Sequence, residues 1–89
     1  MYQPMRVVVA GAYYEAEGFI GLMDNEESLY RYLPEHSLPM IEGFKNIIIL
    51  LMGDYESRED IQEILEYAFH NSFPVYAMDF TEIETKRAH

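Results

Sequence analysis

A run of six apolar residues in the middle of the chain, Ile47 to Met52, most constrains what this sequence can fold into. A strand without a polar side is typical of a sheet that is covered on both faces. A glycine and an aspartate end the run, and Ser57 and Asp60 then have the spacing of a helix capping box. We therefore expect a strand over 46–52 and a helix over 57–71.

The expected helix 57–71 is amphipathic. Its core side carries the apolar residues Ile61, Ile64, Leu65 and Ala68, and its outer side carries Glu59, Glu63, Glu66 and His70. Pro74 then introduces a last strand, expected over 75–80. Because a helix connects the strands 46–52 and 75–80, these two strands are predicted to run parallel.

The first third of the chain has two interpretations. A short β-branched strand begins near Met5, and Gly11 interrupts it. Either this strand ends at Gly11 and a loop follows, as in a nucleotide-binding α/β fold, or it continues, turns at residues 15–18 and returns over 19–23 as a hairpin. We favour the hairpin, because the apolar run after Gly18 is short for a helix and contains a second glycine.

A short helix is expected over 24–33. Asp24 and Glu27 have the spacing of a capping box, Leu29, Tyr32 and Leu33 would form one face, and Pro34 would end the helix. Residues 34–43 contain several apolar side chains and are expected to pack against the core.

Taken together, these elements predict an α/β domain over residues 1–80, with the order β-β-α-β-α-β and a four-stranded mixed sheet with two helices; an α+β arrangement is the alternative. Residues 81–89 are expected to form a frayed tail. Two helices can barely cover both faces of four strands, so a second copy is expected to cover part of the sheet or a helix face, giving a homodimer. Alternatively, helix 24–33 and the segment 34–43 cover the second face alone.

The charge balance excludes several classes of function. Sixteen Asp and Glu against six Lys and Arg give a net charge of −10, which disfavours direct binding to nucleic acid or to an anionic membrane. The chain has no cysteine, and its longest apolar run is far too short to cross a membrane. These features favour a cytoplasmic protein.

The carboxylates are the candidate binding residues. One group, named here the acidic row, follows the central strand and consists of Asp54, Glu56, Glu59, Asp60, Glu63 and Glu66. A secondary acidic patch is expected from Glu15, Glu17, Asp24, Glu26 and Glu27. Carboxylates that repeat along a helix at about 5–6 Å are comparable in spacing with backbone phosphates. The acidic row therefore predicts a basic DNA- or RNA-binding protein as partner; the alternative is a solvated face that only confers solubility.

No motif for catalysis or for metal binding is present. The carboxylates after Gly53 follow a strand but lack the spacing of an EF-hand, and would repel a phosphate. His36, His70 and His89 do not form a ligand set by their spacing, and no glycine-rich phosphate loop occurs. We expect no catalytic residue, no cofactor and no metal ion.

Four segments resemble a shortened nucleoside 2-deoxyribosyltransferase-like domain over about half of the chain: Val7–Gly11, Ile48–Asp54, Glu63–Ala68 and Pro74–Ala77. In that family a helix glutamate attacks the sugar and a Tyr-Ala pair follows it. The resemblance therefore implies a small nucleoside- or nucleotide-processing enzyme that uses Glu63 or Glu66. Neither glutamate has the family's spacing to both Ala68 and Pro74.

A second resemblance is one of overall character. A small, acidic, tyrosine-rich chain without cysteine is similar to the DNA-mimic, anti-restriction inhibitors that bacteriophages direct against restriction nucleases and other DNA-binding proteins. This resemblance implies a non-enzymatic inhibitor that occupies a basic groove through the acidic row. A third hypothesis is a structural subunit that docks to a larger partner through an apolar sheet face.

Overall fold

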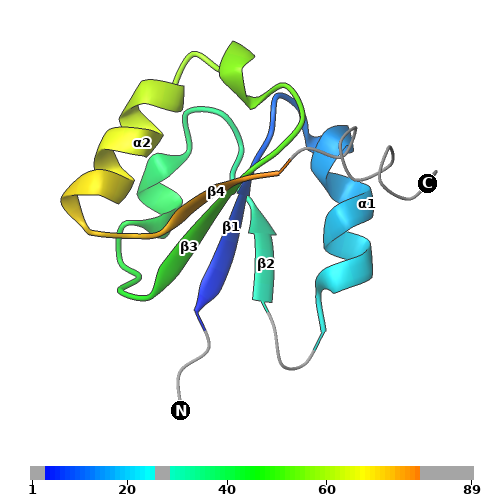
Figure 1. The fold of residues 1–89 in the computed structure, drawn as a ribbon, viewed down its shortest axis with the longest axis horizontal. Helices are drawn as coiled ribbons and strands as arrows, with labels where there is room; N and C mark the ends of the chain where they lie inside the picture. The colour runs from blue at the N-terminus through cyan, green and yellow to red at the C-terminus, as the bar shows by residue number, and fades with distance from the viewer. Residues whose placement is uncertain (1–3, 26–28, 79–89) are drawn as a thin grey trace, which may run out of the picture.

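A computed structural model describes residues 4–25 and 29–78 of the chain. Its elements follow the order β1 (Met5–Val9), α1 (Tyr13–Met23), β2 (Leu29–Tyr32), the 3-10 turn η1 (Leu38–Ile41), β3 (Ile47–Leu51), the 3-10 turn η2 (Tyr55–Ser57), α2 (Ile61–His70) and β4 (Val75–Ala77). The four strands form one sheet in the order β2-β1-β3-β4, and every neighbouring pair is parallel (Figure 1).

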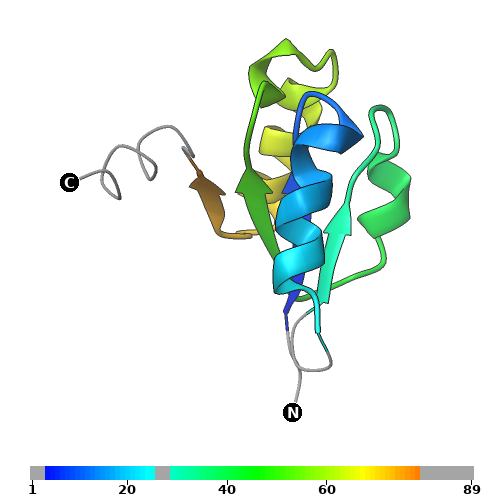
Figure 2. The same cartoon turned by 90° about the vertical axis from the view of Figure 1, so that its right-hand side faces the viewer.

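The sheet lies between two layers. Helix α1 covers one face, whereas α2 and the segment that contains η1 cover the other (Figures 1 and 2). On the α1 side, Val8, Ala10, Ala16, Tyr30 and Met52 form one buried cluster. On the α2 side, a larger cluster consists of Val7, Val9, Leu33, Ile41, Ile47, Ile49, Leu51, Ile64 and Ala68. Alternate residues of the central strands β1 and β3 therefore pack into the two clusters.

Several predictions from the central stretch are confirmed. The domain is a small α/β fold with a four-stranded sheet and two helices, β3 is apolar on both faces, and β3 runs parallel to β4 across α2. The predicted mixed sheet is wrong, because β1 and β2 are also parallel. The error follows from the hairpin, which would have required antiparallel strands.

The predicted hairpin over residues 5–23 is wrong, since β1 is followed by the eleven-residue helix α1. Ala16, Phe19 and Ile20 have helical spacing and pack against the sheet. Gly18 and Gly21 lie inside this helix but on its open side, where an added Cβ would meet no neighbouring element within 4 Å. Each glycine costs the helix about 1 kcal/mol, and packing against β1 and β2 offsets that cost.

The predicted helix over 24–33 is also wrong, because Leu29–Tyr32 form the edge strand β2. Tyr30 is buried between the exposed side chains of Leu29 and Arg31, as the two-residue period of a strand requires. Asp24 does not begin a helix but follows the last residue of α1, and its Oδ1 accepts a hydrogen bond from the backbone N–H of Tyr30 (3.2 Å). Glu27, its predicted capping partner, lies outside the described residues.

Helix α2 begins four residues later than predicted, at Ile61, because η2 precedes it. The Ser57 hydroxyl does not cap α2 but donates to the carbonyl oxygen of Asp54 (2.8 Å). The predicted core side is nevertheless correct: Ile64 and Ala68 are buried, and Ile61 and Leu65 pack against the same cluster. The end of the predicted last strand and the predicted tail lie outside the described residues.

A buried ion pair joins the start of α2 to the ends of the strands. The Arg58 guanidinium donates to both carboxylate oxygens of Asp60, through Nε at 2.9 Å and Nη2 at 3.0 Å. Its Nη1 also donates to the carbonyl oxygens of Leu33 (2.7 Å), just after β2, and Ala10 (3.3 Å), just after β1. Arg58 and Asp60 are only 3% and 2% exposed.

Asp60 also fixes the loop after β2, because its Oδ2 accepts the backbone N–H of His36 (2.9 Å). Burial alone would raise the pKa of the Asp60 carboxyl group. The hydrogen bonds from Arg58 and His36, together with the guanidinium charge, outweigh burial and hold this pKa below its ordinary value of 3.8.

The substitution Asp60→Asn would leave the Arg58 guanidinium buried without its counter-charge, so we expect it to lower the free energy of unfolding by about 3 kcal/mol or more at neutral pH. Because the pKa of Asp60 is lower in the folded than in the unfolded state, its stabilisation is present above about pH 4 and is lost as the pH falls through the folded-state pKa. Urea unfolding of both proteins from neutral pH downward should therefore show a difference that shrinks in acid.

The control for this experiment is Glu17→Gln, which changes an exposed carboxylate on α1. The free energy of unfolding of Glu17→Gln should remain close to that of the wild type over the whole pH range. If Asp60→Asn lowers the free energy of unfolding only slightly, or by the same amount at every pH, the proposed role of the ion pair would be contradicted.

Candidate functional site

The sheet topology defines the edge at which a ligand would be expected. β1 and β3 lie side by side, but α1 follows β1 on one face and α2 follows β3 on the other. Ligands of open α/β sheets bind where two such connections diverge, beyond the carboxyl ends of the strands. In this chain, the loops Ala10–Ala12 and Met52–Asp54 form that edge.

The protein's own Glu15 carboxylate fills this position. Glu15 stands in the first turn of α1 and accepts the backbone N–H of Ala12 through Oε1 (3.0 Å) and the backbone N–H of Asp54 through Oε2 (3.0 Å). One side chain therefore ties the loop after β1 to the loop after β3. These two N–H groups are the donors that would otherwise be available to an anionic ligand.

Two glycines make room for this carboxylate. A Cβ at Gly53 would lie 2.7 Å from the Glu15 carboxylate, and the backbone there has a φ of +58°, which favours glycine. A Cβ at Gly11 would lie 2.6 Å from the carbonyl oxygen of Asp54 and 2.8 Å from Glu15 Oε1. Gly11 and Gly53, which follow β1 and β3, therefore allow the backbone to approach the Glu15 carboxylate closely.

Most of the acidic row lies on the surface. Asp54, Glu56, Glu59, Glu63 and Glu66 are all exposed. Asp60 is buried against Arg58 and is not available to a partner, so its inclusion in the acidic row as a surface contact is wrong. Arg58 is the only Lys or Arg between residues 46 and 85, and it is buried too. The exposed surface of residues 46–78 therefore carries carboxylates without any Lys or Arg.

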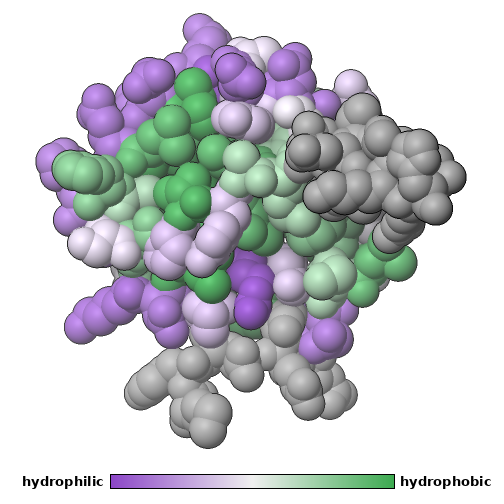
Figure 3. All heavy atoms as spheres, in the orientation of Figure 1, coloured by the Kyte–Doolittle hydropathy of each residue, from purple (hydrophilic) through white to green (hydrophobic). Residues whose placement is uncertain are grey.

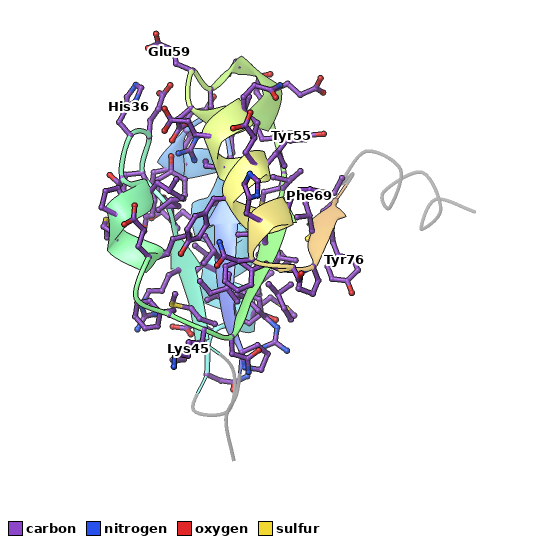
Figure 4. All side chains as sticks on the ribbon, turned by 90° about the vertical axis from the view of Figure 1, so that its left-hand side faces the viewer. His36, Lys45, Tyr55, Glu59, Phe69 and Tyr76 are labelled. Carbon is purple, nitrogen blue, oxygen red and sulfur yellow. The ribbon has the colours of Figure 1, made fainter. Side chains whose placement is uncertain are left out.

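The fold brings a carboxylate that sequence reasoning missed, Glu35, together with His36 and Glu59. Glu35, His36 and Glu59 are all exposed, and their ligand atoms lie within 4.8 Å of one another. Glu35 Oε2 accepts the backbone N–H of Glu59 (2.7 Å), and His36 Nε2 lies 3.7 Å from Glu59 Oε1. Figure 4 shows His36 and Glu59 at the same end of the molecule. These groups could offer ligands to a cation, although exposed acidic groups often gather without one.

The described members of the secondary acidic patch lie in different environments. Glu15 is held between two loops, Glu17 is exposed on α1, and Asp24 lies 3.7 Å from the guanidinium of Arg31. Glu26 and Glu27 lie outside the described residues.

The glutamates that the deoxyribosyltransferase resemblance indicated point away from the sheet. Glu63 and Glu66 are exposed on α2, whereas Ile64 and Ala68 turn inward. Neither glutamate therefore faces the edge between β1 and β3.

Models of protein families, curated proteins and solved structures were compared with this chain, and none matched it. In the described part of the chain, neither helix has the length and apolar character that crossing a membrane requires.

The contact between Gly53 and Glu15 can be measured by a double-mutant cycle. Gly53→Ala should lower the free energy of unfolding by about 1–2 kcal/mol because of the positive φ. It should lower it by a further amount because the new Cβ displaces the Glu15 carboxylate. In a Glu15→Ala background only the cost of the positive φ remains, so the effect of Gly53→Ala should be smaller by about 1 kcal/mol. Urea unfolding of the four proteins gives this coupling free energy, and equal effects of Gly53→Ala in both backgrounds would contradict the contact.

Proposed function

We propose that this chain is a non-enzymatic acidic binding protein that occupies the basic groove of a nucleic-acid-binding protein or nuclease, in the manner of a DNA mimic. The observation that carries the proposal is the burial of Arg58 with Asp60, which leaves the five other members of the acidic row exposed and without a neighbouring Lys or Arg in the stretch 46–78. Exposed carboxylates at this density repel one another and destabilise a small fold. A cationic groove would relieve that repulsion.

The distribution of charge supports the same proposal. Glu35 joins Glu59 beyond the carboxyl ends of the strands, which extends the acidic row across two loops. Lys45 lies at the opposite end of the molecule (Figure 4). A partner with a basic groove would therefore be steered toward the acidic end.

The position of Glu15 supports binding rather than catalysis. The edge at which an α/β sheet would hold a substrate is filled by a side chain of the protein itself, through two backbone hydrogen bonds. The exposed carboxylates lie around this edge and along α2. A partner that binds this end of the molecule would contact them.

Charge reversal tests the proposal. The triple variant Glu59→Lys, Glu63→Lys and Glu66→Lys should weaken binding to the partner by about a hundredfold, because each lost charge pair is worth about 1 kcal/mol or more. The partner is obtained by retention of DNA-binding proteins on the immobilised chain, and its affinity is then measured by calorimetry. Wild-type binding should fall steeply as salt rises, and duplex DNA should displace the chain.

A matched pair of single variants separates position from net charge. Glu63→Lys and Glu17→Lys change the net charge equally, and both residues are exposed on helices, but only Glu63 belongs to the acidic row. Glu63→Lys should weaken binding clearly more than Glu17→Lys. Equal effects, or binding that ignores both salt and DNA, would show that the acidic row serves solubility only.

A further inference from the structure

Strand β4 leaves one edge of the sheet open. It is the last strand in the sheet order, and no described residue pairs with its outer side. The backbone N–H of Ile49 donates to Pro74 (2.9 Å) and that of Met78 donates to Leu51 (2.7 Å). Because the hydrogen-bonding direction alternates along a strand, the N–H and C=O groups of Val75 and Ala77 point away from β3.

This edge lacks the charges that usually protect an edge strand. Residues 67–78 contain no Asp, Glu, Lys or Arg, although these four residue types make up 25% of the chain. Native proteins commonly guard exposed edges with charged side chains, prolines or bulges. The only proline of this stretch, Pro74, precedes β4 and leaves its outward groups free to pair.

Exposed aromatic side chains lie on the side of the molecule that carries the open edge. Tyr76 is 57% exposed and Phe69 of α2 is 82% exposed. Figure 3 looks onto this side and shows hydrophobic area over α2 and β4, with hydrophilic residues above and to the left of it. Figure 4 shows Phe69 and Tyr76 on the same side of the molecule. Apolar area with a polar rim marks an interaction surface.

We propose that this edge pairs with β4 of a second copy of the chain, in an antiparallel arrangement about a two-fold axis at Tyr76. Val75 then faces Ala77 of the second copy, and each such pair exchanges both of its backbone hydrogen bonds. Tyr76 faces Tyr76 of the second copy in a non-hydrogen-bonded pair, where side chains approach most closely. The two sheets become one continuous sheet.

The backbone geometry of β4 suits a second copy as the occupant, because a reversed copy presents the same outward N–H and C=O groups, with Val75 opposite Ala77. Each copy carries −10, so two copies repel each other wherever their carboxylates meet. Residues 67–78 contain no Asp or Glu, so two copies can meet through this stretch without opposing its carboxylates. Self-association through β4 should therefore strengthen as salt rises, because salt screens the repulsion between the copies. Binding through the acidic row has the opposite salt dependence, so the two proposals can fail separately.

A single cysteine tests the two-fold axis directly, because the chain has no cysteine of its own. Tyr76→Cys would face itself across the axis at a separation that a disulfide can span. Mild oxidation should convert it to a covalent dimer at least about tenfold faster than Leu22→Cys, an exposed control on α1. Equal rates of cross-linking would overturn the arrangement.

Opposite charges at the same position give an independent test. Tyr76→Glu and Tyr76→Lys each place like charges against each other across the axis, and each should weaken self-association by about a hundredfold. An equimolar mixture should restore a dimer that contains one copy of each. Sedimentation over a range of protein and salt concentrations measures both effects. A wild-type chain that stays monomeric, or variants that associate like the wild type, would overturn the proposal.

Discussion

The buried Arg58–Asp60 pair is the interaction on which the rest of the structure depends. One guanidinium reaches Asp60 at the start of α2 and the backbone after β1 and β2, and Asp60 in turn holds the loop at His36. These backbone segments are far apart in the sequence. No apolar contact could satisfy the buried carbonyl groups of Ala10 and Leu33. An isolated charge here would cost several kcal/mol, so the pair acts only as a unit. It also removes the only Lys or Arg of residues 46–78 from the surface, and thereby leaves the exposed part of that stretch acidic.

Elements with a strong local sequence pattern were predicted correctly, whereas elements that depend on contacts with distant segments were not. The apolar run in β3 and the amphipathic pattern of α2 are strong local signals, and the parallel unit that they form was predicted correctly. In α1, Gly18 and Gly21 conceal the helical spacing of Ala16, Phe19 and Ile20, whose packing against the sheet overrides glycine's low helix propensity. In the segment 29–33, the residues Leu29, Tyr32 and Leu33 match a helical face by spacing, and only pairing with β1 makes Leu29–Tyr32 a strand.

The candidate site was predictable in its composition and less so in its geometry. The exposure of Glu63 and Glu66 follows from the helical pattern of α2. Asp60 could not be assigned from sequence, because its burial depends on carbonyl groups after β1 and β2 that approach only in the folded chain. The proximity of Glu35 to Glu59 and the position of Glu15 also arise from contacts between distant segments. Glu15 was predicted as a surface carboxylate, and its capping-box spacing from Ala12 is a local signal for only one of its two hydrogen bonds.

The parallel pairing of β1 with β3 has a consequence for the stability of the acidic end. Both α1 and α2 follow parallel strands, so both helices begin at the carboxyl ends of the strands. The aligned peptide dipoles of a helix place partial positive charge at its first turn. The macrodipoles of α1 and α2 therefore direct their positive ends toward the region of Asp54, Glu56 and Glu59. Because β1 and β3 run parallel, the backbone itself supplies part of the counter-charge that the surface side chains lack.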